Sequence, residues 1–469
     1  MDILYIHPTK KLGESKYSYM PIGITALTNL LLDNSYSVEG INLGIEYSLD
    51  VKFDLLTLLK ELKYKILLVD LHWYEHSFGS IKVAEVSKQA NPNIPVIIGG
   101  MTATIYANEI LEKFDCVDYI IKGDGERPLL ELVGSLLREQ YNIKSIPNIA
   151  FRRGTNIVER KITYRCENFD ELDYIPRNIF KNQRFFYLNT IFGPAGVLKN
   201  FFLSVARGCH YQCLHCGGAG ANSKKLFGRS QKEGCLLRTP KKLVSDIKRF
   251  QEKGVQILRT THDLDMFGTE YTKNFFDSIE EQKIDIGIYM ESFQIPSKSF
   301  LHKFYQVFNN KLSTIAISPL SGDDEVRYLN GKHFDNEELM NTLICMANYS
   351  MNVDLFYTLN LVGDSMKAFE SSLKQMEHIA EIYPSENLSL FCLFSIPDPL
   401  ALIRKPKYGV ITELNTFYDY YLYCQKEGDS YVGYGNALLN EWSERQRKLD
   451  VCFKNLKKKY PGLKISIPT

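Results

Sequence analysis

Residues 1–135 alternate short apolar runs with longer stretches in which apolar residues recur at helical spacing. The apolar runs predict strands at 3–6, 38–42, 66–71, 96–98 and 117–121. The longer stretches predict helices at 22–32, 54–62, 81–89, 108–114 and 128–137. Strands that alternate with helices in this way form a doubly wound parallel sheet. Because ligands of such sheets bind beyond the carboxyl ends of the strands, we expect a ligand of this part at that edge.

The same α/β alternation returns near residue 200 and continues for most of the remaining chain. It predicts strands at 203–205, 257–261, 286–290, 314–318, 353–361 and 390–396. It predicts helices between them at 240–253, 271–281, 297–308, 336–349 and 368–382. Six such βα units form a partial (β/α)6 TIM-like barrel, two units short of the closed barrel of eight.

These patterns divide the chain into four parts. The parts are the doubly wound domain at 1–140, a linker with a short hairpin at 141–198, the barrel at 199–400 and a small C-terminal region at 401–469. The C-terminal region is rich in tyrosine and ends in a helix. Two roles are open for it: to cap the barrel and shape a substrate pocket, or simply to pack against the rest of the chain.

The overall composition argues against nucleic-acid and membrane partners. The 469 residues carry a net charge of +1, so no basic field favours nucleic acid. No apolar window reaches the roughly eighteen residues of a transmembrane helix. The start, MDILYIHPTKK, resembles a strand rather than a signal peptide. We therefore expect a cytoplasmic protein.

Three of the ten cysteines stand apart from the others. The remaining seven are scattered, and we expect most of them to be buried and inert. Cys209, Cys213 and Cys216 lie within eight residues in the segment SVARGCHYQCLHCGGAG, which spans 204–220. Their C-x3-C-x2-C spacing favours a [4Fe-4S] cluster in which one iron has no protein ligand and can bind a small molecule.

Two other uses of three cysteines are a structural zinc site and a redox disulfide. Zinc prefers four ligands, commonly from two separated pairs, and the chain has no second cysteine pair of this kind. A disulfide would leave an odd thiol in a reducing compartment. The cluster is therefore the favoured interpretation.

The cysteine loop resembles the signature of the radical S-adenosylmethionine superfamily. The resemblance implies that the three cysteines bind the cluster and that S-adenosylmethionine chelates its open iron. It places His215 near the adenine, and it matches Gly217 and Gly218 to the motif that binds the methionine amino group. Ala219 stands where relatives commonly carry an acidic residue.

Polar residues after later barrel strands match the same superfamily. Asp263 follows the second strand and Glu291 the third, while Ser318 and Ser321 belong to the segment SPLSGDD after the fourth. The resemblance implies that these four residues contact S-adenosylmethionine, as is usual at the carboxyl ends of barrel strands. A polar group that is merely satisfied at a strand end is an equally good interpretation of each.

The N-terminal part lacks the G-x-G-x-x-G of a dinucleotide site. It resembles instead the cobalamin-binding domain of one branch of the radical S-adenosylmethionine proteins. The matching pieces are P-x-G at 21–23, GGMT at 99–102 and VDYIIKGDGE at 117–126. The resemblance implies that Gly99, Gly100, Thr102, Gly123 and Glu126 help to bind cobalamin.

His72 and Trp73 follow the third strand in the segment DLHWYEHSFG. The D-x-H start is similar to the histidine motif that ligates cobalt in other cobalamin modules, but those modules carry it after the first strand. Three interpretations are open: His72 ligates cobalt, His72 or Trp73 lies under the corrin without ligation, or the loop is a packed aromatic segment.

The resemblance implies cobalamin-dependent radical methylation of an unactivated carbon in a small-molecule or peptide substrate. A 5′-deoxyadenosyl radical and methylcobalamin would supply the chemistry, and a flavodoxin or ferredoxin would supply electrons. One alternative is oxidation, ring rearrangement or cyclisation with the same three cofactors. Another is an iron-sulfur and corrinoid-binding protein without catalysis. The sequence does not name the substrate.

Overall fold

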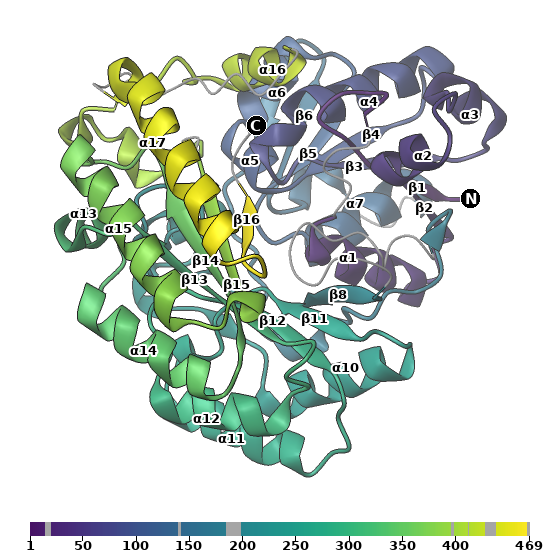
Figure 1. Ribbon diagram of the computed structural model, residues 1–469. Coiled ribbons are helices and arrows are strands. Elements are labelled where there is room, and N and C mark those ends of the chain that lie inside the picture. Colours follow the sequence, from purple (N-terminus) through teal and green to yellow (C-terminus); the bar gives the residue numbers. More distant parts are fainter. Residues whose placement is uncertain are drawn as a thin grey trace.

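The computed structural model describes residues 1–14, 20–138, 142–183, 198–394, 398–410, 412–426 and 438–466. Two large sheets dominate it, one in the N-terminal third of the chain and one in the remainder (Figure 1). Each sheet has seven strands, and a separate two-stranded ribbon stands beside the second sheet. The expected α/β architecture is confirmed.

The first sheet has the strand order β2-β1-β3-β4-β5-β6-β7. Its parallel strands are β1 (Ile3–His7), β2 (Val38–Asn42), β3 (Ile66–Asp70), β4 (Val96–Gly99) and β5 (Tyr119–Ile121). The order 2-1-3-4-5 is that of flavodoxin-like doubly wound sheets. The antiparallel hairpin of β6 (Ile149–Arg153) and β7 (Asn156–Glu159) extends this sheet at its β5 edge.

Helices cover both faces of the first sheet, so its central strands are continuous buried runs. The helices are α1 (Ile22–Asp33), α2 (Leu43–Leu49), α3 (Leu55–Glu61), α4 (Ser77–Ala90), α5 (Met101–Ile105), α6 (Ala107–Lys113) and α7 (Glu126–Arg138). The sequence pattern missed α2 and α5, which are too short to show a helical period. One hydrophobic core runs from the first sheet through α1 and α7 into the second sheet.

The second sheet is entirely parallel and has the order β16-β15-β14-β13-β12-β11-β8. Its strands are β8 (Asn200–Leu203), β11 (Ile257–Thr260), β12 (Gly287–Ser292), β13 (Thr314–Leu320), β14 (Asn352–Thr358), β15 (Leu388–Leu393) and β16 (Lys464–Ser466). The six expected barrel strands are present in sequential order. β8 begins three residues before the expected position, and β16 was not expected.

Helices connect the barrel strands as expected. They are α10 (Pro240–Glu252), α11 (Thr269–Glu280), α12 (Lys298–Val307), α14 (Asn336–Asn348) and α15 (Met366–Ile382). Two shorter helices were missed, α9 (Ser223–Phe227) and α13 (Asp324–Leu329). A ribbon of β9 (Ala206–Arg207) and β10 (Leu236–Leu237) brackets the cysteine loop.

The C-terminal region contacts both halves of the molecule. The helix α16 (Phe417–Gln425) packs on α4, and its Tyr420 and Tyr423 share a small apolar cluster with Tyr74. The helix α17 (Leu438–Lys459) packs on α15, and β16 then joins the edge of the second sheet (Figure 1). The described tyrosines of α16 therefore have a packing role on the first domain. Tyr431 and Tyr434 lie outside the described residues.

Candidate cofactor site

The three cysteines lie on one loop that leaves β9 at Gly208, whose φ of +90° suits glycine. Cys209 and Cys213 are half-buried and Cys216 is exposed, and all three thiols are free. Desolvation by the surrounding loop, together with the negative charges of Asp398, Cys213 and Cys209, raises the pKa of Cys216 to about 12, although part of its side chain is exposed. The three sulfurs thus lie close enough for each charge to be felt by its neighbours.

The spacing of the three thiols fits a cluster better than a single ion. In the described part of the chain, Cys209, Cys213 and Cys216 do not form a group whose ligand atoms all lie within 4.8 Å of one another. Thiolates that share one zinc ion would lie that close together, and a disulfide would join two of them. Thiolates that bind separate irons of a cubane cluster stand farther apart. The donor set and its spacing therefore fit the [4Fe-4S] cluster that the sequence predicts.

A turn after α13 holds the middle of the cysteine loop. The Sγ of Cys213 lies 4.0 Å from the carbonyl oxygen of Gly331. A Cβ on Gly331, whose φ is +94°, would lie 2.8 Å from the Cα of Cys213. His215 Nε2 lies 3.1 Å from Asn330 Oδ1, and burial lowers the pKa of this imidazole to about 4. His215 is therefore neutral at physiological pH.

A second segment, far away in the sequence, holds the end of the loop. The backbone N–H of Gly217 donates to Asp398 Oδ2 at 2.8 Å, and the Gly217 carbonyl accepts from Asn222 Nδ2 at 2.9 Å. Burial raises the pKa of Asp398 to about 6. Sequence reasoning missed Asp398, which places a carboxylate beside the glycine pair although Ala219 carries none.

The cysteine loop also meets the N-terminal domain. A Cβ on Gly218 would lie 3.7 Å from Cys216 Sγ and 3.8 Å from Met101 Cε. Met101 belongs to the GGMT turn, which follows β4 at the carboxyl edge of the first sheet. The end of the cysteine loop therefore lies next to the GGMT turn, and the short helices α5 and α9 that follow the two loops are neighbours.

The loops after β3 and β4 are bonded to one another. The carbonyl oxygen of His72 accepts from both the N–H and the Oγ1 of Thr102, at 3.1 and 3.0 Å. His72 and Trp73 are half-buried, and their rings meet edge to face at 5.0 Å. Burial lowers the pKa of His72 to about 4, so the ring is neutral at physiological pH.

The loop after β3 also carries a buried carboxyl group, that of Glu75, which interacts electrostatically with Asp398. Burial, together with the negative charge of Asp398, raises the pKa of Glu75 to about 7. The Oε2 atom of Glu75 is buried without a hydrogen bond. Two carboxyl groups, one from each half of the molecule, therefore interact electrostatically.

The GDGE segment after β5 forms a hydrogen bond and two ion pairs within the protein. Gly123, with a φ of +64°, donates its N–H to Thr104 Oγ1 at 2.9 Å. Asp124 and Glu126 form ion pairs with Arg207 at 2.8 and 2.7 Å. Arg207 stands two residues before Cys209, so this pair of carboxylates ties the first domain to the start of the cysteine loop.

The polar residues at the barrel strand ends fall into two groups. Ser318 Oγ donates to Glu291 Oε1 at 3.0 Å, and Glu291 is exposed although it follows a buried strand interior. Asp263 accepts from Ser292 Oγ and from the N–H groups of Phe293 and Asp265. Burial raises its pKa to about 6.

Ser321, only 2% exposed, accepts from the N–H of Asp323 at 3.1 Å. Asp263 and Ser321 are thus engaged in turns, whereas Glu291 and Ser318 form a pair that a ligand can reach. His262, beside Asp263, was not singled out from the sequence. Its Nε2 lies 2.7 Å from the carbonyl oxygen of Gly208, so it holds the entry to the cysteine loop.

The B12 binding domain family model matches residues 10–133. The anaerobic magnesium-protoporphyrin IX monomethyl ester cyclase of Cereibacter sphaeroides is 28% identical over 241 residues, which cover 48% of this chain and 36% of the cyclase. The cobalamin-dependent radical SAM methyltransferase TokK of Streptomyces tokunonensis is 24% identical over 224 residues, covering 46% of this chain and 30% of TokK. Residues 10–133 therefore match a B12 binding domain, and the chain as a whole is similar to cobalamin-dependent radical S-adenosylmethionine proteins. The resemblance inferred from its motifs is confirmed.

Two solved structures of cobalamin-dependent radical enzymes share the fold of this chain. The methyltransferase TsrM from Kitasatospora setae, with tryptophan and a SAM analogue, covers 100% of this chain and 91% of its own, with a TM-score of 0.69 and 14% identity. OxsB with aqua-cobalamin covers 95% and 56%, with a TM-score of 0.60 and 11% identity. At these identities the likeness shows the fold alone. The chain spans about a third of the length of the curated relatives above.

The structure describes no helix long and apolar enough to cross a membrane.

Gly100→Ala should weaken cobalamin binding by at least tenfold, measured by visible absorbance in a titration with hydroxocobalamin. Gly100 has a φ of +124°, and a Cβ there would lie 2.6 Å from the backbone of Leu71 and His72. The two loops must separate to admit it, and a tenfold loss corresponds to about 1.4 kcal/mol.

Gly99→Ala is the matched control. A Cβ on Gly99 would meet the carbonyl oxygen of Ile121 at 3.6 Å, an ordinary contact, so this variant should lose much less affinity than Gly100→Ala although it lies in the same turn. If Gly100→Ala binds hydroxocobalamin as tightly as the parent, the turn after β4 does not shape the corrin site.

Proposed function

We propose that this chain is a cobalamin-dependent radical S-adenosylmethionine methyltransferase. Its substrate is a small molecule or a peptide, and the carbon that it methylates is unactivated. The observation that carries the proposal is the close approach of the cysteine loop, at Gly218, to the GGMT turn, at Met101. Transfer between two cofactors requires their sites to adjoin, and these two loops do.

The three cofactors have separate residues in this proposal. Cys209, Cys213 and Cys216 hold a [4Fe-4S] cluster. S-adenosylmethionine lies between this loop and the barrel, near His215, Gly217, Gly218, Asp263, Glu291, Ser318 and Ser321. Cobalamin lies at the carboxyl edge of the first sheet, near His72, Trp73, Gly99, Gly100, Thr102 and Gly123. When bound, these cofactors supply the radical and methyl-transfer chemistry, while the protein binds, orients and shields them.

The role of Glu126 is better explained by its ion pair with Arg207 than by contact with a corrin. His72 and Trp73 remain candidates for the surface under the corrin. The neutral His72 imidazole can ligate a metal, since its pKa is about 4 as a result of burial. Both side chains are half-buried, so a large flat ligand could reach them.

The polar groups around the cysteine loop orient what binds there. Asp398 fixes the Gly217 backbone, and the neutral His215 presents an uncharged flat ring against the turn at Asn330. The carboxyl groups of Glu75 and Asp398 favour a cationic group between the two halves, because a positive charge there would lower both raised pKa values. An external one-electron donor such as flavodoxin or ferredoxin completes the proposed system.

One experiment separates methylation from the other radical reactions. The anaerobically reconstituted protein, loaded with hydroxocobalamin, is reduced and given S-adenosylmethionine with a deuterated methyl group and a pooled extract of small metabolites. Methylation should release both 5′-deoxyadenosine and S-adenosylhomocysteine and yield a product with the intact deuterated methyl group. If the loaded protein releases neither nucleoside, the enzyme proposal is wrong.

A second candidate is oxidative cyclisation with the same cofactors. It is favoured by the name of the relative from Cereibacter sphaeroides, a cyclase that is 28% identical over the matched region. In the experiment above, cyclisation would release 5′-deoxyadenosine without S-adenosylhomocysteine and without deuterium in the product.

A further inference from the structure

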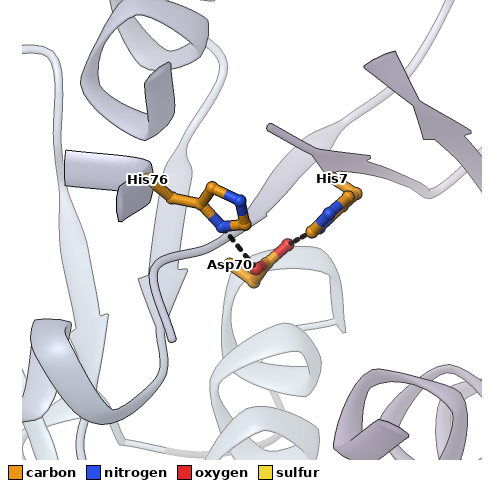
Figure 2. A group of neighbouring side chains, drawn as sticks. All are labelled: His7, Asp70 and His76. Atoms are coloured by element: carbon orange, nitrogen blue, oxygen red, sulfur yellow. Dashed lines mark hydrogen bonds and ion pairs between the residues drawn. The ribbon is translucent and has the colours of Figure 1, made fainter. Parts of the chain in front are cut away.

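A buried group of two histidines and one aspartate lies below the loop after β3 (Figure 2). His7 ends β1, Asp70 ends β3, and His76 ends the short 3-10 helix η1 (Tyr74–His76). One ligand atom from each lies within 4.8 Å of the other two, and no other such group of three occurs in the described ranges. The exposures of 0%, 2% and 1% leave no path for water in bulk.

Hydrogen bonds account for only one oxygen of the Asp70 carboxylate. Its Oδ1 accepts from the hydroxyl of Tyr5 at 2.5 Å and faces His7 Nδ1 at 2.8 Å. Its Oδ2 is buried without a hydrogen bond, and His76 Nδ1 lies 3.8 Å away. That separation is too long for a hydrogen bond, and a buried carboxylate oxygen left without a partner is costly.

The charge of the group also favours a bound cation. Burial would by itself raise the pKa of Asp70, but the charge and hydrogen bond of His7, together with the nearby imidazole of His76, hold it well below its usual range. The carboxylate is therefore ionised only while its surroundings carry positive charge. Either a proton on an imidazole or a bound cation can provide that charge.

The cobalt of cobalamin cannot be that cation. The three side chains are buried within the carboxyl edge of the first sheet, and a corrin ring is far too large to reach them. His7 is the last residue of β1, close to the place where other cobalamin modules carry the histidine that ligates cobalt. Because its side chain is buried, His7 cannot be a cobalt ligand. Only a bare ion fits, so this site is distinct from the corrin site above it and from the cysteine loop.

We propose that His7, Asp70 and His76 bind a zinc-type divalent transition-metal ion. Two imidazoles and one carboxylate form a donor set that suits zinc, whereas calcium and magnesium prefer oxygen ligands alone. Both oxygens of Asp70 face the histidines, so the carboxylate can supply two of the four donor positions. The ion joins β1, β3 and η1, and it braces the loop that carries His72 and Trp73.

The test counts zinc in a background that lacks the cysteine loop's thiols. In the full chain with Cys209, Cys213 and Cys216 all changed to serine, we expect about one zinc per chain after dialysis against a weak chelator. Zinc X-ray absorption should show nitrogen and oxygen ligands at about 2.0–2.1 Å and no sulfur near 2.3 Å. His7→Asn and His76→Asn should each lower the zinc content at least tenfold.

His378→Asn is the matched control, because His378 lies exposed on α15 beside Glu381. Added zinc should raise the Tm of the parent and of His378→Asn but not that of His76→Asn, since only a ligand bound to the folded state stabilises it. If a folded parent holds no zinc, the group is a protonated hydrogen-bond network and the proposal is wrong. If a histidine variant does not fold, the absorption spectrum of the parent still decides.

Discussion

Replacing Cys213 by alanine should leave the purified chain unable to hold an iron–sulfur cluster. Three thiolates on one loop are the proposed protein ligand set, and two cannot fix a cubane. Anaerobic reconstitution should give about four irons per chain for the parent and close to none for the variant. The visible charge-transfer absorption should disappear in parallel, while the circular dichroism of the folded chain stays unchanged.

Cys235→Ala is the matched control for that experiment. Cys235 is half-buried next to the loop, and a Cβ on Gly208 would lie 3.9 Å from its Cα. Burial, together with the charge of Cys209, raises its pKa to about 11. We expect Cys235→Ala to retain the full iron content. Loss of iron in this variant would mean that four cysteines hold the cluster, which would leave no open iron for S-adenosylmethionine.

The two sheets could be predicted because buried parallel strands appear in a sequence as continuous apolar runs. β3 is buried at every position, so the apolar run that contains it stands out between polar loops. The same holds for the barrel strands β8 and β11 to β14, which alternate with amphipathic helices of ten residues or more. The sequential order of the barrel strands then follows from the rule that neighbouring βα units lie side by side.

Elements without a repeat could not be predicted in the same way. β16 has three residues, of which two are exposed, and it is a strand only because β15 lies beside it. β8 was placed three residues too late, because the apolar run continues through Val205 after the strand itself has ended. In both cases tertiary pairing, rather than local pattern, sets the ends of the strand.

The candidate site shows the same division. The cysteine spacing is local, so it was visible at once. Asp398 accepts a hydrogen bond from Gly217 although the two residues are 181 positions apart in the sequence. No local pattern near either residue predicts that contact. His7 and Asp70 come from different strands, 63 positions apart, and they meet because β1 and β3 are parallel neighbours. Side chains brought together by strand order become visible only once that order is known.

Arg207→Met should lower the free energy of unfolding by about 3–5 kcal/mol. Arg207 is 16% exposed at its side chain, and its partners Asp124 and Glu126 are 1% and 8% exposed. Burial already raises the pKa of Asp124, although Arg207 lowers it. Without the guanidinium, two carboxylates are left in the interior with no compensating charge. Urea denaturation followed by circular dichroism measures the loss.

The pH dependence of the deficit has a definite sign. Burial already raises the folded-state pKa of Asp124, and loss of Arg207 removes the charge that opposes this rise. Stability of the variant is then highest where Asp124 is protonated, and it falls as the pH rises through the raised value. The deficit relative to the parent should therefore be larger at about pH 8 than at about pH 5. An equal deficit at both values would mean that lost packing, not unpaired charge, is responsible.

Two further variants isolate the charge effect. Arg249→Met removes a half-exposed pair with Asp173, whose side chains are 39% and 24% exposed, and it should cost only about 0–1 kcal/mol. Adding Asp124→Asn and Glu126→Gln to Arg207→Met should restore much of the stability, because the buried groups are then neutral.

The same ion pairs should also affect how well the chain binds its cofactors. Arg207 lies two residues before Cys209, while Asp124 and Glu126 open the last helix of the first domain. Arg207→Met should therefore still bind about four irons, since all three thiols remain, but it should retain cobalamin less well through gel filtration than Arg249→Met does. Undiminished cobalamin in Arg207→Met would show that the ion pairs stabilise the chain without aligning its two cofactor loops.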